Sequence, residues 1–324
     1  MARKVRIEYE GAIYHVINRG NYRNWIFESE GARQAFEGCL FEACEKSDWV
    51  LHAYVLMGNH YHLAVETPQG NLVAGMTWLQ STFATRFNRY RKEKGHLFQG
   101  RYKALIVQDG GWLGNLCQYI HLNPVRAGLI DVKGLRGYRF SSYWYLWRAR
   151  KRPEFMNVES YLETAGDLKD TPAGRRRYEK YLEWMNEDDQ VKKKAGFDAM
   201  SRGWALGGKD FKKELVKEHR ERLGRMDLGE DDVGELRRLR WEEVADRCLA
   251  SLGKGSREIA SERKSVPWKV AIAAFLKKKT QAPNPWIAEK LNMGIPNGVS
   301  RYVGLMDQTK GRRIYEQLIK EIEV

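Results

Sequence analysis

Residues Leu51 to Pro68, LHAYVLMGNHYHLAVETP, indicate the fold that we expect for the first half of the chain. It is rich in Val, Leu, Ala and Tyr and is interrupted by Gly58-Asn59, so it predicts two strands that form a hairpin or continue each other. Residues i and i+2 of a strand share a face, so His60 and His62 should project side by side while Tyr61 points into a core. Two imidazoles on one rigid face form most of a metal site.

The residues on either side of this stretch predict an α+β sandwich. Strand patterns cover 12–18 and 101–108, and apolar residues at helical spacing cover 30–46, 71–92 and 112–123. The resulting order is strand, helix, strand pair, helix, strand, helix. It indicates a small antiparallel sheet with helices on one face.

The composition points to a polyanionic partner. The chain has 324 residues, a net charge of +14 and a pI near 9.5. Residues 1–150 hold 20 Lys and Arg against 12 Asp and Glu, so the excess of basic residues is not confined to one end. Both halves are therefore candidates for contact with nucleic acid.

Several classes of protein are disfavoured. No run of about 18 apolar residues predicts a membrane span, and the N-terminus has no apolar core typical of a signal peptide. We therefore expect a cytoplasmic, nucleoid-associated protein. The four cysteines form no C-x-x-C pair, so we expect neither a disulfide framework nor a cysteine zinc site.

Three parts are predicted along the chain: 1–150 as a catalytic domain, 151–233 as a helical connecting region and linker, and 234–324 as a helical DNA-binding domain. The composition typical of a linker covers 228–236, across the last of these boundaries. In the last part, 286–291 and 296–306 are separated by a short turn with Gly294, which is typical of a helix-turn-helix. Ser300, Arg301 and Tyr302 on the second helix would then contact DNA. An ordinary helical hairpin is the alternative.

The helix predicted over 112–123 supplies a third metal ligand and a nucleophile, which the two histidines do not provide. Tyr119 and Asn123 are four residues apart, so they share a face of that helix. The Asn side chain offers an oxygen ligand for a divalent ion, and a deprotonated tyrosine can attack phosphorus and hold the product covalently. Imidazole suits Mn²⁺ better than Mg²⁺, and Pro124 disfavours helical geometry at Asn123, which we expect on a frayed last turn.

Three motifs, in this order, carry a resemblance to a known family: GNHYHL (58–63), HLFQGRYK (96–103) and YIHLNPVRAGLI (119–130). Over about residues 5–150 the chain resembles the HUH single-tyrosine transposases, and within them the REP-associated tyrosine transposases. The resemblance implies a ferredoxin-like catalytic domain. It also implies cutting of single-stranded DNA at hairpin-marked ends through a 5′-phosphotyrosine intermediate, with Mg²⁺ or Mn²⁺ as cofactor, and rejoining of the strands. A homodimer is compatible with it.

The resemblance assigns roles residue by residue. His60 and His62 match the pair of metal ligands, Tyr119 matches the nucleophile, and Asn123 matches the third ligand, carried by a helix. Gly58 departs from the Pro that commonly precedes Asn-His in the family. This departure alters the approach of the strand but removes no ligand.

Four basic residues of the first half are candidates for contacts with DNA phosphates. Arg86 and Arg89 lie near the end of the helix predicted over 71–92, where positive charge also complements the helix dipole. Arg101 and Lys103 belong to the second motif, and no chemical step can be assigned to them.

The sequence thus predicts a transposase-like, metal-dependent DNA strand transferase that acts on single-stranded hairpin DNA and, through its C-terminal part, on duplex DNA. Two alternatives stay open. A domesticated regulator would bind the same DNA with little or no cutting, although the intact set of His60, His62 and Tyr119 argues against it. A metal-dependent hydrolase would use activated water, and its activity would survive Tyr119→Phe.

Overall fold

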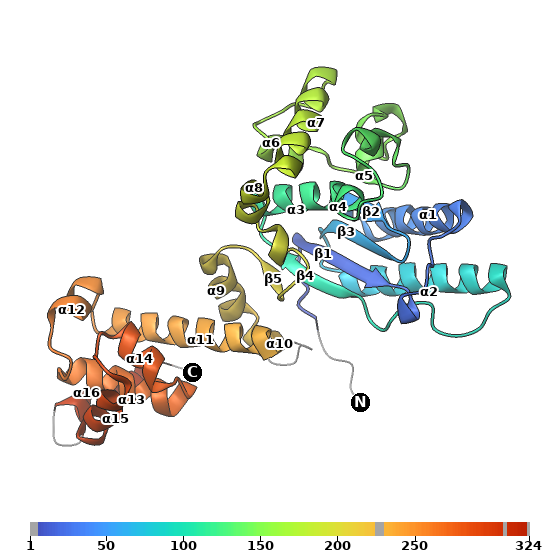
Figure 1. Ribbon diagram of the computed structural model, residues 1–324. Coiled ribbons are helices and arrows are strands. Elements are labelled where there is room, and N and C mark those ends of the chain that lie inside the picture. The colour runs from blue at the N-terminus through green and yellow to red at the C-terminus, as the bar shows by residue number, and fades with distance from the viewer. Residues whose placement is uncertain (1–5, 224–229, 307–309, 323–324) are drawn as a thin grey trace. The chain divides into compact units, whose positions relative to one another are not determined.

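The computed structural model describes residues 6–223, 230–306 and 310–322. The chain divides into two compact units, Met1–Gly208 and Lys209–Val324, which we call unit 1 and unit 2 (Figure 1). Unit 1 contains the sheet, and unit 2 is helical. In these described ranges, no helix combines the length and the apolar character needed to cross a membrane.

Unit 1 is built on a five-stranded sheet with the order β2-β3-β1-β4-β5. The strands are β1 (Ala12–Arg19), β2 (Val50–Leu56), β3 (His60–Thr67), β4 (Lys103–Val107) and β5 (Ala205–Leu206). All neighbours are antiparallel except β4 and β5. Helix α1 (Glu30–Ser47) follows β1, and α2 (Leu72–Arg91) follows β3. This β1-α1-β2-β3-α2-β4 order confirms the predicted ferredoxin-like α+β fold.

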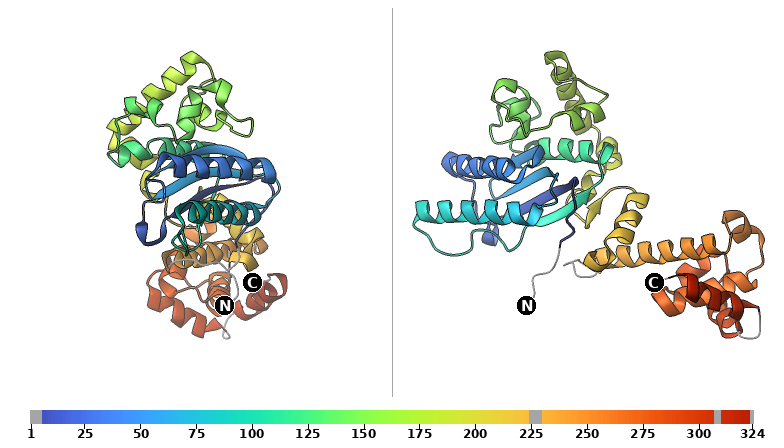
Figure 2. Two further views of the ribbon diagram at one scale, coloured as in Figure 1. Left: turned by 90° about the vertical axis from the view of Figure 1, so that its right-hand side faces the viewer. Right: turned by 180° about the vertical axis from the view of Figure 1, so that it is seen from behind.

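Helices cover both faces of this sheet, whereas the sequence analysis predicted them on one face (Figure 2). Helices α1 and α2 pack together, and their Phe36 and Phe83 rings contact each other beside Tyr61 of β3. Helix α3 (Gly111–His121) packs against β2 and β3 on the opposite face. The reason lies in β2, where every residue after Val50 is buried, because a strand that is apolar on both sides needs cover on both.

The segment 151–208 belongs to unit 1, although the sequence predicted a boundary at 150. Helix α6 packs on α3, and β5 extends the sheet beside β4. The further helical elements of unit 1 are η1 (Asn21–Arg23), α4 (Asn123–Arg126), η2 (Lys133–Gly137), α5 (Ser142–Leu146), η3 (Ala149–Lys151), α6 (Glu159–Thr164), α7 (Pro172–Glu187), α8 (Asp189–Lys194) and η4 (Phe197–Ala199). The core of unit 1 therefore extends well beyond the predicted catalytic domain.

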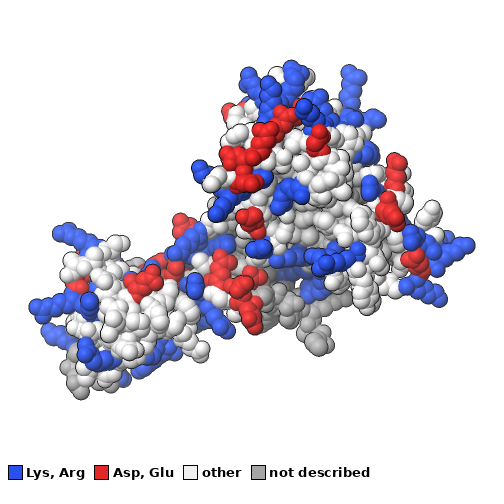
Figure 3. Space-filling model, in the orientation of Figure 1, with Lys and Arg blue, Asp and Glu red and all other residues white. Residues whose placement is uncertain are grey.

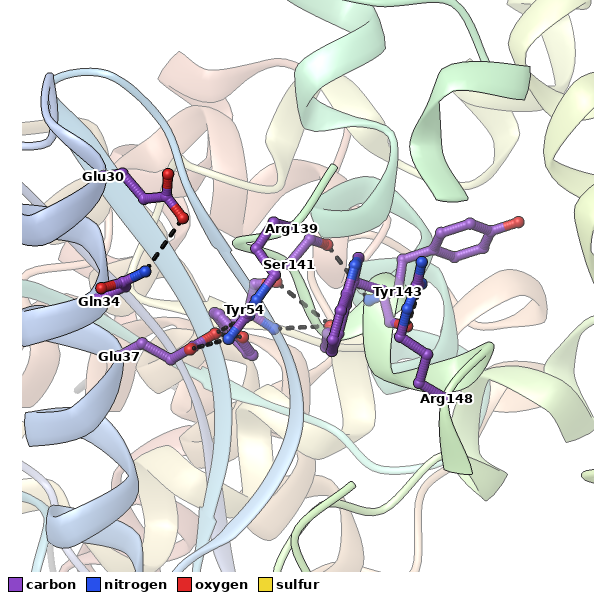
Figure 4. A network of polar contacts seen from close by, with 10 residues as sticks. Glu30, Gln34, Glu37, Tyr54, Arg139, Ser141, Tyr143 and Arg148 are labelled. Atoms are coloured by element: carbon purple, nitrogen blue, oxygen red, sulfur yellow. Dashed lines mark hydrogen bonds and ion pairs between the residues drawn. The ribbon is translucent and has the colours of Figure 1, made fainter. Parts of the chain in front are cut away.

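An ion pair between the buried Glu37 and the half-buried Arg139 ties α1 to the segment that precedes α5 (Figure 4). Arg139 donates two hydrogen bonds of 2.8 Å to the carboxylate of Glu37, whose side chain is only 7% exposed. The Tyr54 hydroxyl of β2 donates to the same carboxylate, and the Arg139 guanidinium lies 4.4 Å from the centre of the Trp144 ring. Three parts of the fold thus meet at one carboxylate.

The helices of unit 2 are α9 (Lys209–Glu218), α10 (Arg220–Leu223), α11 (Glu230–Ser251), α12 (Ser256–Ser261), α13 (Pro267–Thr280), α14 (Asn284–Lys290), α15 (Pro296–Gly304) and α16 (Gly311–Glu321). Helices α11, α14, α15 and α16 pack on α13, and α9 packs on α11. The predicted linker over 228–236 is wrong from Glu230 onward, where α11 begins; 228–229 lie outside the described residues. Three acidic residues in the first turn of α11 stabilise its start through the helix dipole.

Candidate active site

Strand β3 carries His60 and His62 on the face of the sheet that α3 covers. The Asn59 amide nitrogen donates to the Arg23 carbonyl, so its Oδ1 atom, 2.7 Å from His60 Nδ1, accepts the hydrogen bond from that nitrogen. Burial and the nearby Arg19 lower the pKa of His60 to about 4. His60 is therefore neutral at pH 7, with a lone pair on Nε2.

The register of β1 against β3 adds a third histidine. Ile17 pairs with His62 and His15 with Ala64, so His15 and His62 are diagonal neighbours on one face. Their rings stack with centroids 5.1 Å apart, and His15 Nε2 lies 2.9 Å from His62 Nδ1. Burial lowers the pKa of His15 to about 4 and holds the pKa of His62 well below its usual value, so both rings are neutral at pH 7.

Tyr119 comes from the last turns of α3, opposite the histidines. Its ring is edge-on to His62, with centroids 5.8 Å apart, and edge-on to Phe197 at 5.4 Å. Its hydroxyl oxygen lies 3.0 Å from Ser201 Oγ, and the Arg126 guanidinium lies 4.5 Å from the centre of its ring. Tyr119 is therefore held from three sides.

Asn123 begins the short helix α4 rather than ending α3. Helix α3 ends at His121, and Pro124 occupies the first turn of α4, where proline is well tolerated because its missing N–H has no partner in a helix. The predicted frayed end is thus the start of a second helical segment. Asn123 lines the same cleft as Tyr119.

One cleft of about 910 Å³ brings His60, His62, Tyr119 and Asn123 together. Its walls also carry five basic residues, Arg19, Arg23, Arg101, Lys103 and Arg126. No Asp or Glu of the described residues lines it. Figure 3 shows Lys and Arg side chains on the drawn face of each unit. A cleft lined in this way attracts phosphate groups.

The donor set fits a divalent ion with mixed ligands. Two neutral imidazoles and one amide oxygen suit Mn²⁺ well and Mg²⁺ less well. No cluster of three His, Cys, Asp or Glu side chains that could hold a metal ion occurs among the described residues, so the third protein ligand here would be the Asn123 oxygen.

Of the four basic residues of unit 1 that were predicted to contact DNA, two line the cleft and two do not. Arg101 and Lys103 line the cleft, and Lys103 Nζ donates to the Ser201 carbonyl at 3.1 Å. Arg86 and Arg89 lie on α2 and do not line it, and Arg86 forms an ion pair with Glu42.

The three residues predicted to contact DNA from the C-terminal part, Ser300, Arg301 and Tyr302, lie on α15 of unit 2. Ser300 Oγ accepts hydrogen bonds from Lys277 and Asn284, so it joins α15 to α13 and α14. The exposed Arg301 lies 5.1 Å from the centre of the Tyr302 ring.

The sequence did not predict several residues of the cleft region, among them Arg19 and Arg23 of its walls and His15, Arg126 and Ser201. His15 has the same parity as Ile13 and Ile17 in its strand, but only the register shows that it meets His62. Arg126 follows Tyr119 and Asn123 at helical spacing, a signal that Pro124 obscured. Ser201 lies 82 residues from Tyr119, and no local pattern predicts that contact.

Comparison with known proteins finds similarity to one family within unit 1. The family described as "Transposase IS200 like" matches residues 8–123, which include His60, His62, Tyr119 and Asn123. A Haemophilus influenzae protein, provisionally named a REP-associated tyrosine transposase, is 23% identical over 144 residues, which cover 41% of this chain and 81% of that protein. A solved structure of a REP-associated tyrosine transposase bound to a REP hairpin aligns with 49% of this chain and 96% of its own, with 15% identity and a TM-score of 0.39.

Proposed function

We propose that this chain, whose residues 8–123 match the family described as "Transposase IS200 like", cuts and rejoins single-stranded, hairpin-marked DNA through a 5′-phosphotyrosine intermediate. One observation carries the proposal. The Tyr119 side chain shares a basic cleft with two neutral histidines and an asparagine, where a nucleophile, metal ligands and phosphate-binding cations can act on one phosphodiester.

In the proposed reaction, the Tyr119 oxygen attacks the scissile phosphorus. The P–O bond to Tyr119 forms while the bond to the 3′ oxygen breaks. The phenolic proton passes to solvent and the 3′ oxygen takes up a proton, which leaves a 5′-phosphotyrosine and a free 3′ hydroxyl. Attack by a 3′ hydroxyl on the phosphotyrosine reverses these steps, so rejoining needs no external energy source.

The surrounding side chains fix the nucleophile and neutralise charge. Ser201 Oγ holds the Tyr119 hydroxyl, and Arg126 covers the ring and brings positive charge close to the attacked phosphate. His60, His62 and Asn123 would hold a divalent ion, Mn²⁺ or Mg²⁺, which polarises the scissile phosphate when bound.

Binding of single-stranded DNA in this cleft predicts a specific salt dependence. We expect Arg23→Gln to reduce the slope of log K against log[salt] by about 0.7, since each neutralised phosphate of a single strand contributes about that amount. Arg23 lines the cleft, whereas Arg89 on α2 does not. Fluorescence anisotropy with a hairpin oligonucleotide measures both slopes. Equal slopes for Arg23→Gln and the control Arg89→Gln would argue against DNA in the cleft.

We further propose that unit 2 binds duplex DNA through α15. Helices α14 and α15 are joined by a short turn in which Asn292 and Gly294 have positive φ angles, and Arg301 is exposed on the second helix. A helix presented in this way fits the major groove.

Arg301→Gln is expected to weaken duplex binding by the full chain by about 1–3 kcal/mol, because it removes a contact to base or phosphate. The exposed Arg257→Gln on α12 is the matched control and should change binding little. Anisotropy with duplexes from the DNA that flanks the gene measures both variants. If neither variant lost affinity for duplex DNA, α15 would not be the DNA-binding surface of unit 2.

A denaturing gel tests the proposed reaction. Labelled hairpin oligonucleotides from the flanking DNA are incubated with the full chain and Mn²⁺, or with EDTA. We expect a shifted protein–DNA band that requires the metal. Cleavage with free 5′ ends and no shifted band would support the hydrolase, and binding without cutting across oligonucleotides and metals would support the regulator.

A further inference from the structure

A chain of two hydrogen bonds links His62 to the backbone of a distant segment. His15 Nδ1 lies 2.7 Å from the Met200 carbonyl oxygen, and His15 Nε2 lies 2.9 Å from His62 Nδ1. His15 is fully buried and His62 is 4% exposed, so water cannot readily replace either partner. The positions of the protons in these two hydrogen bonds are therefore determined by protein groups alone.

The Met200 carbonyl determines the position of each proton in the two hydrogen bonds. A carbonyl oxygen can only accept, so His15 Nδ1 must carry a proton and donate it to Met200. In a neutral ring Nε2 is then the acceptor, so His62 Nδ1 must donate to it. His62 is left with its lone pair on Nε2.

We propose that His15 is a positioning residue that fixes His62 in the tautomer whose Nε2 atom can bind a divalent cation. The ring stacking at 5.1 Å also restricts the rotation of the His62 ring. This inference rests on the proposed function, in which His62 is a metal ligand, because a metal ligand in the cleft requires a fixed Nε2 lone pair.

The opposite tautomer is disfavoured by the burial of both rings. If His62 carried its proton on Nε2, two lone pairs would face each other at the 2.9 Å contact. Both nitrogen atoms would then be buried without a donor, which destabilises this tautomer.

The Met200 carbonyl, which ends this series of hydrogen bonds, lies outside residues 8–123 that match the family. Met200 follows η4, and the strand contact of β5 with β4 holds this segment against the sheet. The Trp204 carbonyl accepts from the Ile106 amide, and the Ser201 carbonyl accepts from Lys103. The segment 197–201 therefore orients His62 through His15 and Tyr119 through Ser201.

Nitrogen NMR of the metal-free full chain tests the tautomers directly. With ¹⁵N-labelled histidine rings, we expect the resonances of His15 and His62 both to show a protonated Nδ1 and an unprotonated Nε2. The resonances are assigned by the variants His15→Leu and His62→Gln. A protonated Nε2 on His62 in the wild type would overturn the proposal.

Metal affinity gives the second readout. His15→Leu is expected to weaken Mn²⁺ binding about 10- to 100-fold in calorimetry, because outer partners of metal-binding histidines contribute about that factor. His52→Leu is the matched control, since His52 is also a buried strand histidine but pairs with Glu66 away from the cleft. A folded His15→Leu variant with unchanged Mn²⁺ affinity would overturn the positioning role. If the wild type binds no Mn²⁺, the metal site of the proposed function fails, while the tautomer measurement still decides the role of His15.

Discussion

Tyr119→Phe is expected to lower both strand cleavage and the covalent protein–DNA product by at least about 10³-fold. The substitution removes the attacking oxygen and leaves the ring between His62, Phe197 and Arg126. Hairpin binding should therefore change little, because the cations of the cleft are unaltered. Single-turnover cleavage on a denaturing gel, with anisotropy for binding, measures the two quantities.

Tyr161→Phe is the matched control for this substitution. Tyr161 is buried in the same core, its hydroxyl has no hydrogen-bond partner among the described residues, and it does not line the cleft. We expect wild-type cleavage from Tyr161→Phe. Cleavage that persists in Tyr119→Phe, with free 5′ ends, would contradict attack by the tyrosine and favour activated water.

Arg139→Met is expected to lower the free energy of unfolding of unit 1 by up to about 3–5 kcal/mol, the cost of leaving a buried charge, here that of Glu37, without its partner. The Met side chain keeps apolar contact with Trp144 but leaves the Glu37 side chain, 7% exposed, without its two hydrogen bonds from Arg139. Denaturant unfolding of the full chain, followed through the transition of unit 1, measures the loss.

Arg86→Met provides the comparison for this loss. Arg86 also pairs with a carboxylate of α1, that of Glu42, but the two side chains are 48% and 39% exposed. An exposed pair contributes about 0–1 kcal/mol, so we expect a small change in the free energy of unfolding. Equal losses in Arg86→Met and Arg139→Met would show that the Glu37 network does not anchor α1.

Much of the fold could be predicted from the sequence, because the strands and helices of unit 1 have clear periods and clear breaks. The hairpin at Gly58-Asn59 and the helices α1 to α3 follow from such local patterns. The cover on both faces was missed because small residues such as Ala53 and Ala64 do not by themselves indicate a packed face. The division after Gly208 was missed because β5 joins the sheet from far along the chain.

The residues of the cleft show the same limit. That Tyr119 and Asn123 lie close together could be predicted, since four residues make about one turn of a helix, and both line the cleft. His15 and Ser201 could not, because their contacts depend on strand register and on a segment about 80 residues from Tyr119. Long-range packing determines these partners, and periodicity carries no information about it.

Mass spectrometry of the covalent product identifies the residue to which the DNA is joined. Trypsin should release the peptide 104–126, in which Tyr119 is the only residue with a phenolic or aliphatic hydroxyl. We predict that the wild type, incubated with hairpin DNA and Mn²⁺ and then digested, yields this peptide with a 5′-linked nucleotide on Tyr119. Cleaved DNA with the nucleotide on another peptide, or with no modified peptide, would contradict tyrosine transesterification by Tyr119.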